Sequence, residues 1–353
     1  MISVSSAGCG TGWQHPAAGV QILQIHNSST ATVEVQLQNP ANGAVYAQVE
    51  GIGPATTRSM PVNLGSGDYS FSCSSLNFGA RTGPVVRVPG RTRGGSAILP
   101  LTPNQVNSIT AQARAYVASG LDTLLPQVTA LSADISGGNL TAARIAWLTA
   151  HLTWERLGGA YGMFGSYDDE INGTPSGSVN DPGFTGFYRL EYGLWHGQTA
   201  AELTGVANQL TVNVRVLRTA WPGIELATTQ AVGDLALRTH EILEDAMQNQ
   251  LSGLDNFGSG TTLATFTAGI DATRAQLGIL RSYLGPRYPQ TQALYRSLDQ
   301  LQHLADAEKT STGWTPAGKL SISRRARLDA AAGQTLELLA PIPVMFEQER
   351  PVP

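Results

Sequence analysis

Two segments of the sequence each carry a histidine and a glutamate four residues apart. His151 and Glu155 lie in one apolar segment, and His240 and Glu244 repeat the spacing further along the chain. On a helix, side chains four residues apart are separated by about 40° and share one face. Imidazole and carboxylate groups are both metal ligands, so each pair is a candidate part of a metal site.

More candidate ligands lie between these two pairs. Tyr167-Asp-Asp-Glu170 is a short acidic run, and Tyr188 precedes Glu191 in an aromatic segment. An unpaired carboxylate buried among Leu, Trp, Tyr and Phe is costly, and a shared cation would offset that cost. Carboxylates with imidazole or phenolate suit a hard or borderline metal ion. The candidate ligands are therefore His151, Glu155, Asp169, Tyr188, Glu191, His240 and Glu244.

These residues also have an interpretation without a metal. A His-x-x-x-Glu pair on a helix is commonly a surface pair. Glu155 and Glu191 have arginines nearby, Arg156 and Arg189, with which salt bridges between helices can form. The acidic run can simply cap a turn. The sequence alone leaves the metal site and these contacts as alternatives.

The elements that would position the candidate ligands are helices. From Thr102 onward apolar residues recur at helical spacing, and Thr102-Pro103 is typical of a helix start. Further helices are predicted over about 140–164, 185–196, 199–220, 224–251, 261–282, 288–307 and 321–341. Consecutive helices without intervening strands indicate a helical bundle.

The first hundred or so residues have a different pattern. Alternating or β-branched segments predict strands over 20–26, 31–37, 44–50, 68–73 and 85–89, and turn clusters separate them. Short strands at such spacing indicate an all-β sandwich. The segment 89–96 is rich in Gly and Arg, as linkers are. We therefore predict an α+β two-domain protein, with an all-β domain over 1–98 and an all-α helical bundle over 99–353.

The composition excludes some classes of protein. The chain has 353 residues, 22 Lys+Arg against 26 Asp+Glu, and a formal net charge of −4. A mildly acidic chain without a run of Lys and Arg argues against nucleic-acid binding. The sequence holds no stretch of about 18 uninterrupted apolar residues, so we expect no transmembrane segment.

The two cysteines, Cys9 and Cys73, both fall in the predicted β domain. A disulfide between them would tie the N-terminus to the sheet, and a metal-binding thiolate is the alternative. A type-1 copper centre is not expected, because the loop after Cys73 contains no histidine. The Ser-, Thr-, Asn- and Gln-rich composition favours an exported protein. The opening residues lack the basic and apolar segments of a signal peptide, so we expect a mature chain.

Several motifs, taken in order, resemble the EfeO-type iron-uptake branch of the imelysin superfamily. The N-terminal part is similar to the cupredoxin-like domain of that branch, and Cys9 and Cys73 correspond to that domain's two cysteines. The motifs of the helical part are Glu155-Arg-Leu-Gly-Gly-Ala-Tyr-Gly-Met-Phe164, Asp168-Asp169, Asp181-Pro-Gly-Phe-Thr-Gly-Phe-Tyr-Arg-Leu-Glu-Tyr-Gly-Leu-Trp-His196, Ala236-Leu-Arg-Thr-His-Glu-Ile-Leu-Glu-Asp245 and Ser282-Tyr-Leu-Gly-Pro-Arg-Tyr-Pro289.

The resemblance implies a fold and a function. The fold would be a cupredoxin-like sandwich followed by imelysin-like paired four-helix bundles. The protein would be exported, at the cell surface, outside the cell or in the periplasm, and would capture ferrous or ferric iron. Its partners would be an iron permease and a haem peroxidase of the dye-decolourising type. Copper at Cys9 and Cys73 is an alternative for the N-terminal domain.

The sequence departs from the family's pattern at two ligand positions. The family's His-x-x-Glu signature reads Tyr188-Arg-Leu-Glu191 here, and its frequent Glu-x-x-Glu reads Glu155-Arg-Leu-Gly158. The loss of an imidazole weakens the case for zinc and for a zinc-peptidase mechanism, whereas phenolate with carboxylates suits Fe(III). Three alternatives remain for this site. Tyr188 replaces the histidine as a ligand, or His151 or His240 supplies a nitrogen ligand from a neighbouring helix, or the metal site has been lost.

Three functions compete at this point. We expect a non-enzymatic iron-binding protein. The runner-up is a metallopeptidase, which the His/Glu pairs and the superfamily's similarity to peptidases would support. The third is a binder of acidic polysaccharides, for which the net charge of −4 requires a bridging metal ion.

Overall fold

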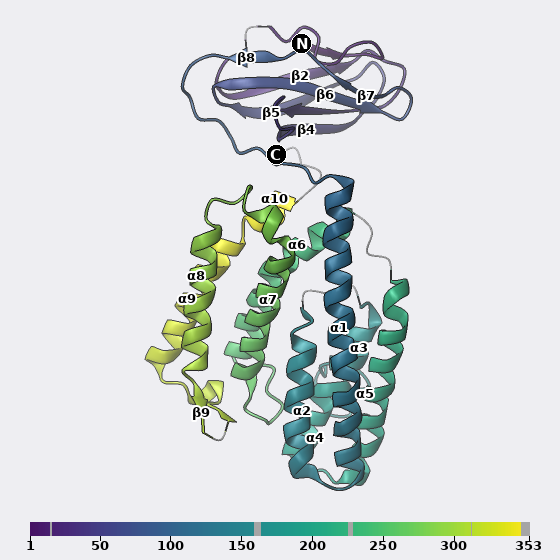
Figure 1. Ribbon diagram of the computed structural model, residues 1–353, viewed down its shortest axis with the longest axis vertical. Coiled ribbons are helices and arrows are strands. Elements are labelled where there is room, and N and C mark those ends of the chain that lie inside the picture. Colours follow the sequence, from purple (N-terminus) through teal and green to yellow (C-terminus); the bar gives the residue numbers. More distant parts are fainter. Residues whose placement is uncertain (15, 159–163, 225–228, 312, 347–353) are drawn as a thin grey trace. The chain divides into compact units, whose positions relative to one another are not determined.

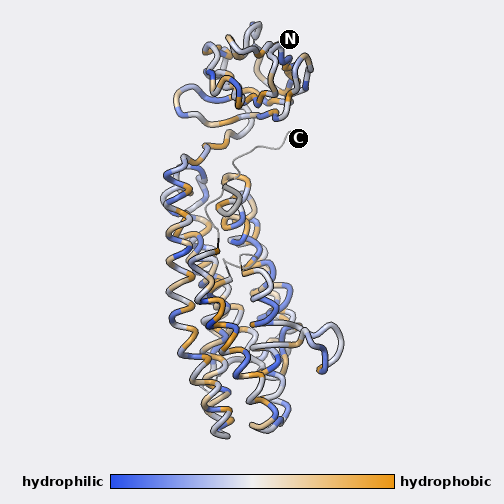
Figure 2. The backbone as a smooth tube through the Cα atoms, turned by 90° about the vertical axis from the view of Figure 1, so that its right-hand side faces the viewer, coloured by the Kyte–Doolittle hydropathy of each residue, from blue (hydrophilic) through white to orange (hydrophobic). Residues whose placement is uncertain are grey.

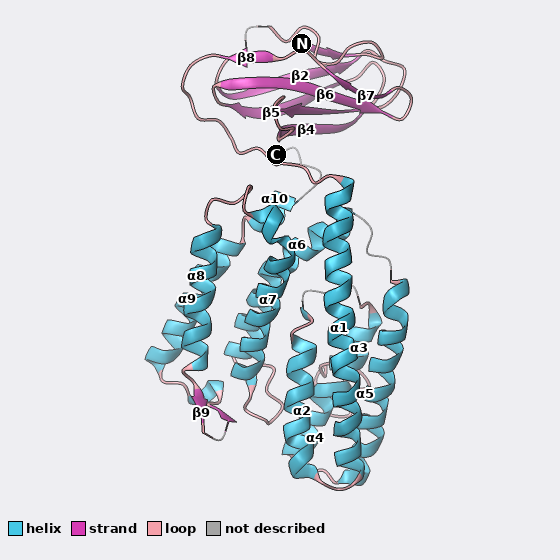
Figure 3. Cartoon of the chain, in the orientation of Figure 1, coloured by secondary structure: helices cyan, strands magenta, loops and turns pink. Residues whose placement is uncertain are grey.

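The structure, a computed structural model, describes residues 1–346 except 15, 159–163, 225–228 and 312. The chain divides into two compact units, residues 1–102 and residues 103–343, and the described residues from Val344 onward group with the first unit. The first unit contains strands and the second is mainly helical (Figure 3). The predicted α+β organisation, a β domain followed by helices, is confirmed.

The N-terminal unit is built from two sheets. One has the strand order β1-β2-β5, and the other has the order β4-β3-β6-β7, with β8 also pairing with β6. Strand β1 runs parallel to β2, and the pairs β2–β5, β3–β4 and β3–β6 are antiparallel. The strands are β1 (Ile2–Val4), β2 (Gly19–Asn27), β3 (Val33–Gln38), β4 (Val45–Ile52), β5 (Thr57–Leu64), β6 (Gly67–Ser75), β7 (Gly79–Thr82) and β8 (Val86–Val88).

The β core follows from alternation along the strands. In β3, Val33, Val35 and Leu37 are buried while the residues between them are partly exposed, because successive side chains point to opposite faces. Cys9 and Cys73 belong to this core and form a disulfide with a Cα–Cα distance of 5.8 Å. In the disulfide neither sulfur is a thiolate. A copper site on the thiolates of Cys9 and Cys73, the alternative considered above, would therefore require reduction of this disulfide.

Strands β1, β5 and β7 of the N-terminal unit differ from the predicted set. The segment of β5 reads Thr-Arg-Ser-Met-Pro-Val-Asn-Leu, and proline is rare within strands. Strand β7 is exposed at every residue, so it has no apolar alternation to detect. Strand β7 forms because β6 pairs with it. In β1 and β5 alternate apolar residues are buried, Ile2 and Val4 in one and Met60, Val62 and Leu64 in the other, and sequence reasoning missed this alternation.

The first half of the helical unit is a four-helix bundle. Helices α1, α2, α4 and α5 pack against one another, and α3 lies against α4 and α5 (Figure 1). An asparagine cap begins α2, where Asn139 Oδ1 accepts a hydrogen bond from the backbone N–H of Ala142 at 3.2 Å. The helices are α1 (Pro103–Ser136), α2 (Leu140–Glu155), α3 (Ser166–Asn172), α4 (Gly186–Trp195) and α5 (Ala200–Ala220).

The second half is another bundle, in which α6 packs on α7 and α9, and α8 packs on α7 and α9. Helix α2 contacts α7 and so joins the two bundles, which confirms the predicted pairing of four-helix bundles. A short hairpin of β9 (Lys309–Thr310) and β10 (Gly313–Trp314) follows α8. The helices are α6 (Thr229–Asp245), the π-helical segment Ala246–Leu251, α7 (Thr262–Leu284), α8 (Thr291–Asp306), α9 (Ile322–Leu339) and α10 (Ile342–Phe346).

The predicted helices differ from the observed ones mainly near the site. The helix predicted over 140–164 has Glu155 as its last helical residue, and 159–163 lie outside the described residues, as do 225–228 of the helix predicted over 224–251. Helix α3 was not predicted. Asp168 and Asp169 occupy its first turn.

Figure 2 shows hydrophilic and hydrophobic residues alternating along the helices. Within the described ranges, no helix has both the length and the apolar character that crossing a bilayer requires.

Candidate metal centre

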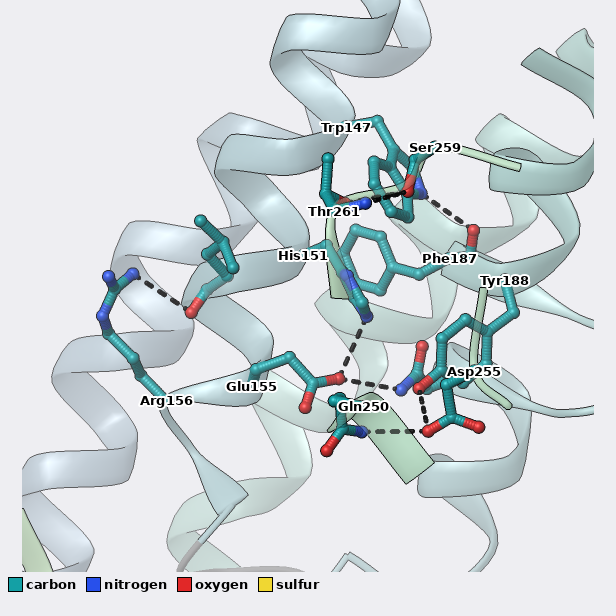
Figure 4. A network of polar contacts seen from close by, with 12 residues as sticks. Trp147, His151, Glu155, Arg156, Phe187, Tyr188, Gln250, Asp255, Ser259 and Thr261 are labelled. Carbon is teal, nitrogen blue, oxygen red and sulfur yellow. Dashed lines mark hydrogen bonds and ion pairs between the residues drawn. The ribbon is translucent and has the colours of Figure 1, made fainter. Parts of the chain in front are cut away.

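His151 is the most buried of the predicted ligands that carry nitrogen. Its side chain, 2% exposed, lies one turn before the end of α2 and stacks on Trp147 with ring centroids 4.9 Å apart. The rings of Phe187 and Tyr188 pack around it at 5.2 Å and 5.4 Å. His151 Nε2 lies 3.0 Å from Glu155 Oε1 (Figure 4). The i, i+4 pair on α2 is therefore an interior pair.

Glu155 also connects α2 to α3. The side-chain amide of Asn172, at the end of α3, donates a hydrogen bond from Nδ2 to Glu155 Oε1 at 3.1 Å. The close approach of α3 and α4 depends on Gly186, whose φ is +53°. A Cβ there would lie 1.8 Å from the carbonyl oxygen of Ile171, so only glycine fits. Gly186 thus lets α4 begin beside the residues that reach Glu155.

Tyr188 reaches a carboxylate from the second bundle. Its hydroxyl donates to Asp255 Oδ2 at 3.3 Å, and the Gln250 amide donates to the same oxygen at 2.9 Å (Figure 4). Burial, then the charges of Glu155, Asp255 and Glu191, raise the pKa of Tyr188 well above its usual value, and a hydrogen bond with Asn172 acts in the opposite direction. The phenol is therefore protonated and acts as a hydrogen-bond donor.

Glu191, one turn after Tyr188, is held by the loop that precedes α7. Its Oε1 accepts hydrogen bonds from the backbone N–H groups of Phe257 and Ser259, at 3.1 Å and 2.9 Å, and from Ser259 Oγ at 2.6 Å. The residue is 1% exposed. Burial raises the pKa of Glu191, and these donors and His151 work against that rise. The arrangement fixes one carboxylate oxygen of Glu191.

The carboxylates in this region destabilise one another's charged forms. Burial first, and the charge of Glu155 second, raise the pKa of Asp255, while the hydrogen bond from Tyr188 lowers it. Burial, Glu155 and Asp169 together raise the pKa of Asp168 to about 6, with Arg238 opposing them. A bound cation would relieve this repulsion, because it favours the ionised form of every nearby carboxylate.

A small cavity adjoins Glu155 where the two bundles meet. Its volume is about 40 Å³, which is enough for a water molecule or a metal ion. Asp245, at the end of α6, lines the cavity and is exposed, whereas Glu155 lines it and is buried. The cavity therefore has one carboxylate at the protein surface and one in the interior. The cavity is lined by Glu155, Gly158, Ile242, Asp245, Ala246, Gln250, Thr265 and Gly269.

The structure gathers some of the predicted ligands and separates others. His151, Glu155, Tyr188 and Glu191 belong to one buried group, in which each makes a contact or acts electrostatically on another. We call these four residues, together with the half-buried Asp255 and Asn172, the buried cluster.

The remaining predicted ligands are at the surface. Asp169 is exposed in the first turn of α3. His240 and Glu244 pair with each other on α6, at 3.5 Å between Nδ1 and Oε2, with side chains 24% and 44% exposed.

Sequence reasoning missed Asn172, Gln250, Asp255 and Ser259. Asp255 and Ser259 lie in the segment Gly253-Leu-Asp-Asn-Phe-Gly-Ser-Gly260, which has the composition of an ordinary loop. Gln250 lies in the π-helical segment, one residue before its end, and such a segment is often found at functional sites but has no sequence signature. A polar side chain in such a loop gives no signal of the carboxylate or phenol that it will meet.

The buried cluster is not a ready-made metal cage. Among the residues that the structure describes, no three His, Cys, Asp or Glu side chains converge as metal ligands. Hydrogen bonds from Asn172 to Glu155 and from Tyr188 to Asp255 hold the carboxylates instead. The donor chemistry of carboxylate, phenol and imidazole nevertheless fits a hard metal ion such as Fe(III).

Comparison with known proteins places this site within a family. The family model described as Imelysin (Peptidase_M75) matches residues 109–342. The Iron uptake system component EfeO of Yersinia pestis is 24% identical over 316 residues, covering 88% of this chain and 81% of the relative. The protein of the same name from Escherichia coli K12 is 24% identical over 329 residues, covering 92% and 84%. The match spans more than half of the chain and all the residues of the buried cluster, and the chain therefore belongs to the imelysin family.

Proposed function

We propose that this protein is an exported iron-binding component of an iron-uptake system and that it binds iron in the buried cluster. The observation that carries the proposal is the group of interior carboxylates around Tyr188 and His151. Glu191 is 1% exposed and Tyr188 is 5% exposed. The three hydrogen bonds that Glu191 accepts from described residues all end on Oε1, so Oε2 of this buried carboxylate could face a cation. The similarity to iron-uptake components of the same family supports iron as the cargo.

The ligand chemistry favours iron over zinc. Carboxylate and phenol oxygens are hard donors, which suit Fe(III), and His151 adds one borderline nitrogen. Iron would exchange with the hydrogen bonds that now hold Glu155 and Asp255. Release of the ion would return Glu155 and Asp255 to these hydrogen bonds, so neither carboxylate would be left without a partner, as suits a carrier.

Export and the partners follow as parts of the same proposal. The Cys9–Cys73 disulfide supports an oxidising compartment such as the periplasm or the cell exterior. The relatives are named as components of an iron uptake system. We propose that the iron is passed to a membrane permease and that a dye-decolourising haem peroxidase works beside it.

The geometry supports binding better than catalysis. A zinc peptidase needs several nitrogen ligands, an open metal position and a general-base carboxylate. Within the described part of the chain, His151 is the histidine of the buried cluster, and His240 pairs with Glu244 elsewhere. We therefore prefer the non-enzymatic function to the peptidase and to the metal-bridged polysaccharide binder.

Iron titration of matched variants tests this proposal. Glu191→Gln and Glu155→Gln should each weaken iron binding by at least about 10-fold, because each removes a buried anionic oxygen. Glu244→Gln removes the same charge from the exposed pair and should leave the affinity within about twofold of the wild type. Equal affinities in all four proteins would contradict the proposal. Chelator-sensitive cleavage of an unfolded substrate would favour the peptidase.

A further inference from the structure

The loop between the π-helical segment and α7 supplies a carboxylate that no sequence motif marks. We infer that Asp255 is an additional iron ligand, contributed to the buried cluster by the second bundle. The inference rests on the proposed function, since it adds a ligand to the same site. It makes the site a joint product of both bundles rather than of α2 and α4 alone.

The hydrogen bonding of Asp255 leaves one oxygen for a cation. Both hydrogen bonds that it accepts from described residues, from Tyr188 at 3.3 Å and from Gln250 at 2.9 Å, end on Oδ2. The carboxylate thus keeps Oδ1 for a metal ion while Oδ2 stays anchored. Gln250, which donates to Asp255, also lines the cavity beside Glu155, so Asp255 lies at the edge of the same site.

Two buried polar atoms of the buried cluster make no hydrogen bond to a described residue. His151 Nδ1 makes no hydrogen bond to a described residue, although the side chain is only 2% exposed, while Nε2 faces Glu155 Oε1 at 3.0 Å. The Oδ1 atom of Asn172 is likewise buried without a hydrogen-bond partner in the described chain. Buried polar atoms are normally paired, so these lone pairs mark a place where a cation would be stabilised.

The loop that carries Asp255 is fixed against α4. The Asn256 side chain accepts hydrogen bonds from the backbone N–H groups of Gly258 at 3.2 Å and Gly260 at 2.9 Å. Gly258 has a φ of +131°, and a Cβ there would lie 2.8 Å from the Cβ of Trp195 on α4. The same loop holds Glu191 through Ser259. Asp255 is therefore presented by a rigid turn, as a ligand position requires.

The competing explanation is that Asp255 only anchors Tyr188. Asp255→Asn separates the two explanations, because an asparagine oxygen can still accept the hydrogen bond from Tyr188 but carries no charge. An anchor would survive this change, whereas an anionic ligand would not. Asp299→Asn is the matched control, since Asp299 lies on α8 of the same bundle and its side chain is 71% exposed.

The experiment measures iron affinity and the iron–oxygen coordination number by X-ray absorption in the full chain. We expect Asp255→Asn to weaken iron binding by about 100-fold and to lower the number of coordinating oxygens. Asp255→Glu should restore most of the affinity, and Asp299→Asn should change the affinity by less than about threefold.

One result would overturn the inference about Asp255 while the proposed function stands. In that case the wild type binds iron and Glu191→Gln abolishes binding, but Asp255→Asn leaves affinity and coordination unchanged. If the wild type binds no iron, both fail. Thermal unfolding of each variant identifies misfolding. If Asp255→Asn misfolds, Asp255→Glu provides the test instead. Wild-type affinity and coordination in Asp255→Glu would support Asp255 as a ligand, and weak iron binding would overturn the inference.

Discussion

The chain contains the same His-x-x-x-Glu spacing on two helices, and the two copies have different environments. On α2, His151 and Glu155 have side chains 2% and 11% exposed and lie 3.0 Å apart. On α6, His240 and Glu244 are 24% and 44% exposed and lie 3.5 Å apart. The comparison shows that spacing places two side chains on one helix face, whereas the packing around that face decides whether the pair can hold a buried ion.

The neighbours of each pair explain the difference. Trp147 stacks on His151, and Phe187 of α4 covers it. The pair on α6 stands among charged residues, with Arg238 bound to Glu241 at 2.9 Å and Asp245 exposed nearby. A water-exposed ion pair contributes little to stability, whereas a buried one leaves a costly charge behind when either partner is removed.

The largest expected effect comes from breaking the buried pair. His151→Ala should lower the free energy of unfolding by about 3 kcal/mol, because it leaves Glu155 buried with fewer partners and opens a void beside Trp147. Urea denaturation followed by circular dichroism measures it. A loss below about 0.5 kcal/mol would show that the pair on α2 is as dispensable as an exposed one.

A smaller effect is expected from the loop that supports Glu191. Ser259→Ala removes the 2.6 Å hydrogen bond to Glu191 Oε1 and should weaken iron binding by about 10-fold, as changes in groups that orient a ligand do. Ser259→Thr keeps a hydroxyl and should recover most of the affinity. Ser252→Ala, an exposed serine of the same connection, is the control. Identical affinities for the alanine variants at 252 and 259 would remove Ser259 from the positioning role.

The acidic run at the start of α3 provides a prediction about pH. The folded-state pKa of Asp168, about 6, lies above its ordinary value of 3.8. The ionised carboxylate therefore opposes folding at neutral pH, and this penalty disappears as the pH falls from 6 to below 3.8. Asp168→Asn should raise the unfolding free energy by about 1 kcal/mol at pH 7.5 and by almost nothing at pH 3.5. Asp169→Asn removes only one of the charges that raise this pKa, so it should raise the unfolding free energy at pH 7.5 by less than Asp168→Asn does. An equal or larger gain for Asp169→Asn would contradict the assignment.

The smallest effect is expected from the exposed pair on α6. His240→Ala and Glu244→Gln should each change the unfolding free energy by less than about 0.5 kcal/mol. They should also leave the iron affinity unaltered. A loss of iron binding in either variant would move the site from the buried cluster to α6.

The sequence predicts the fold better than the site. The change from strand to helix periodicity near Thr102 gives the two-part organisation, because each period reports burial directly. Trp147 and Trp154 flank His151 on the inner side of α2, and this aromatic context is the available signal that its pair is buried. For His240 the charged neighbours Arg238, Glu241 and Asp245 give the opposite signal.

The part of the site that sequence reasoning missed comes from tertiary contacts. Asp255 meets Tyr188, and Ser259 meets Glu191, across sequence separations of 67 and 68 residues. These contacts depend on how a loop of the second bundle docks on α4, where Gly258 permits a close approach to Trp195. Neither periodicity nor motif spacing carries information about such docking.

The most direct test of the central claim is the position of bound iron. Crystals of the iron-loaded protein, measured at the iron absorption edge, should show an anomalous-scattering peak among the side chains of Glu155, Tyr188, Glu191 and Asp255. The peak should be absent in Glu191→Gln crystals prepared in the same way. A peak beside His240 and Glu244, or one that persists in the Glu191→Gln protein, would contradict the account.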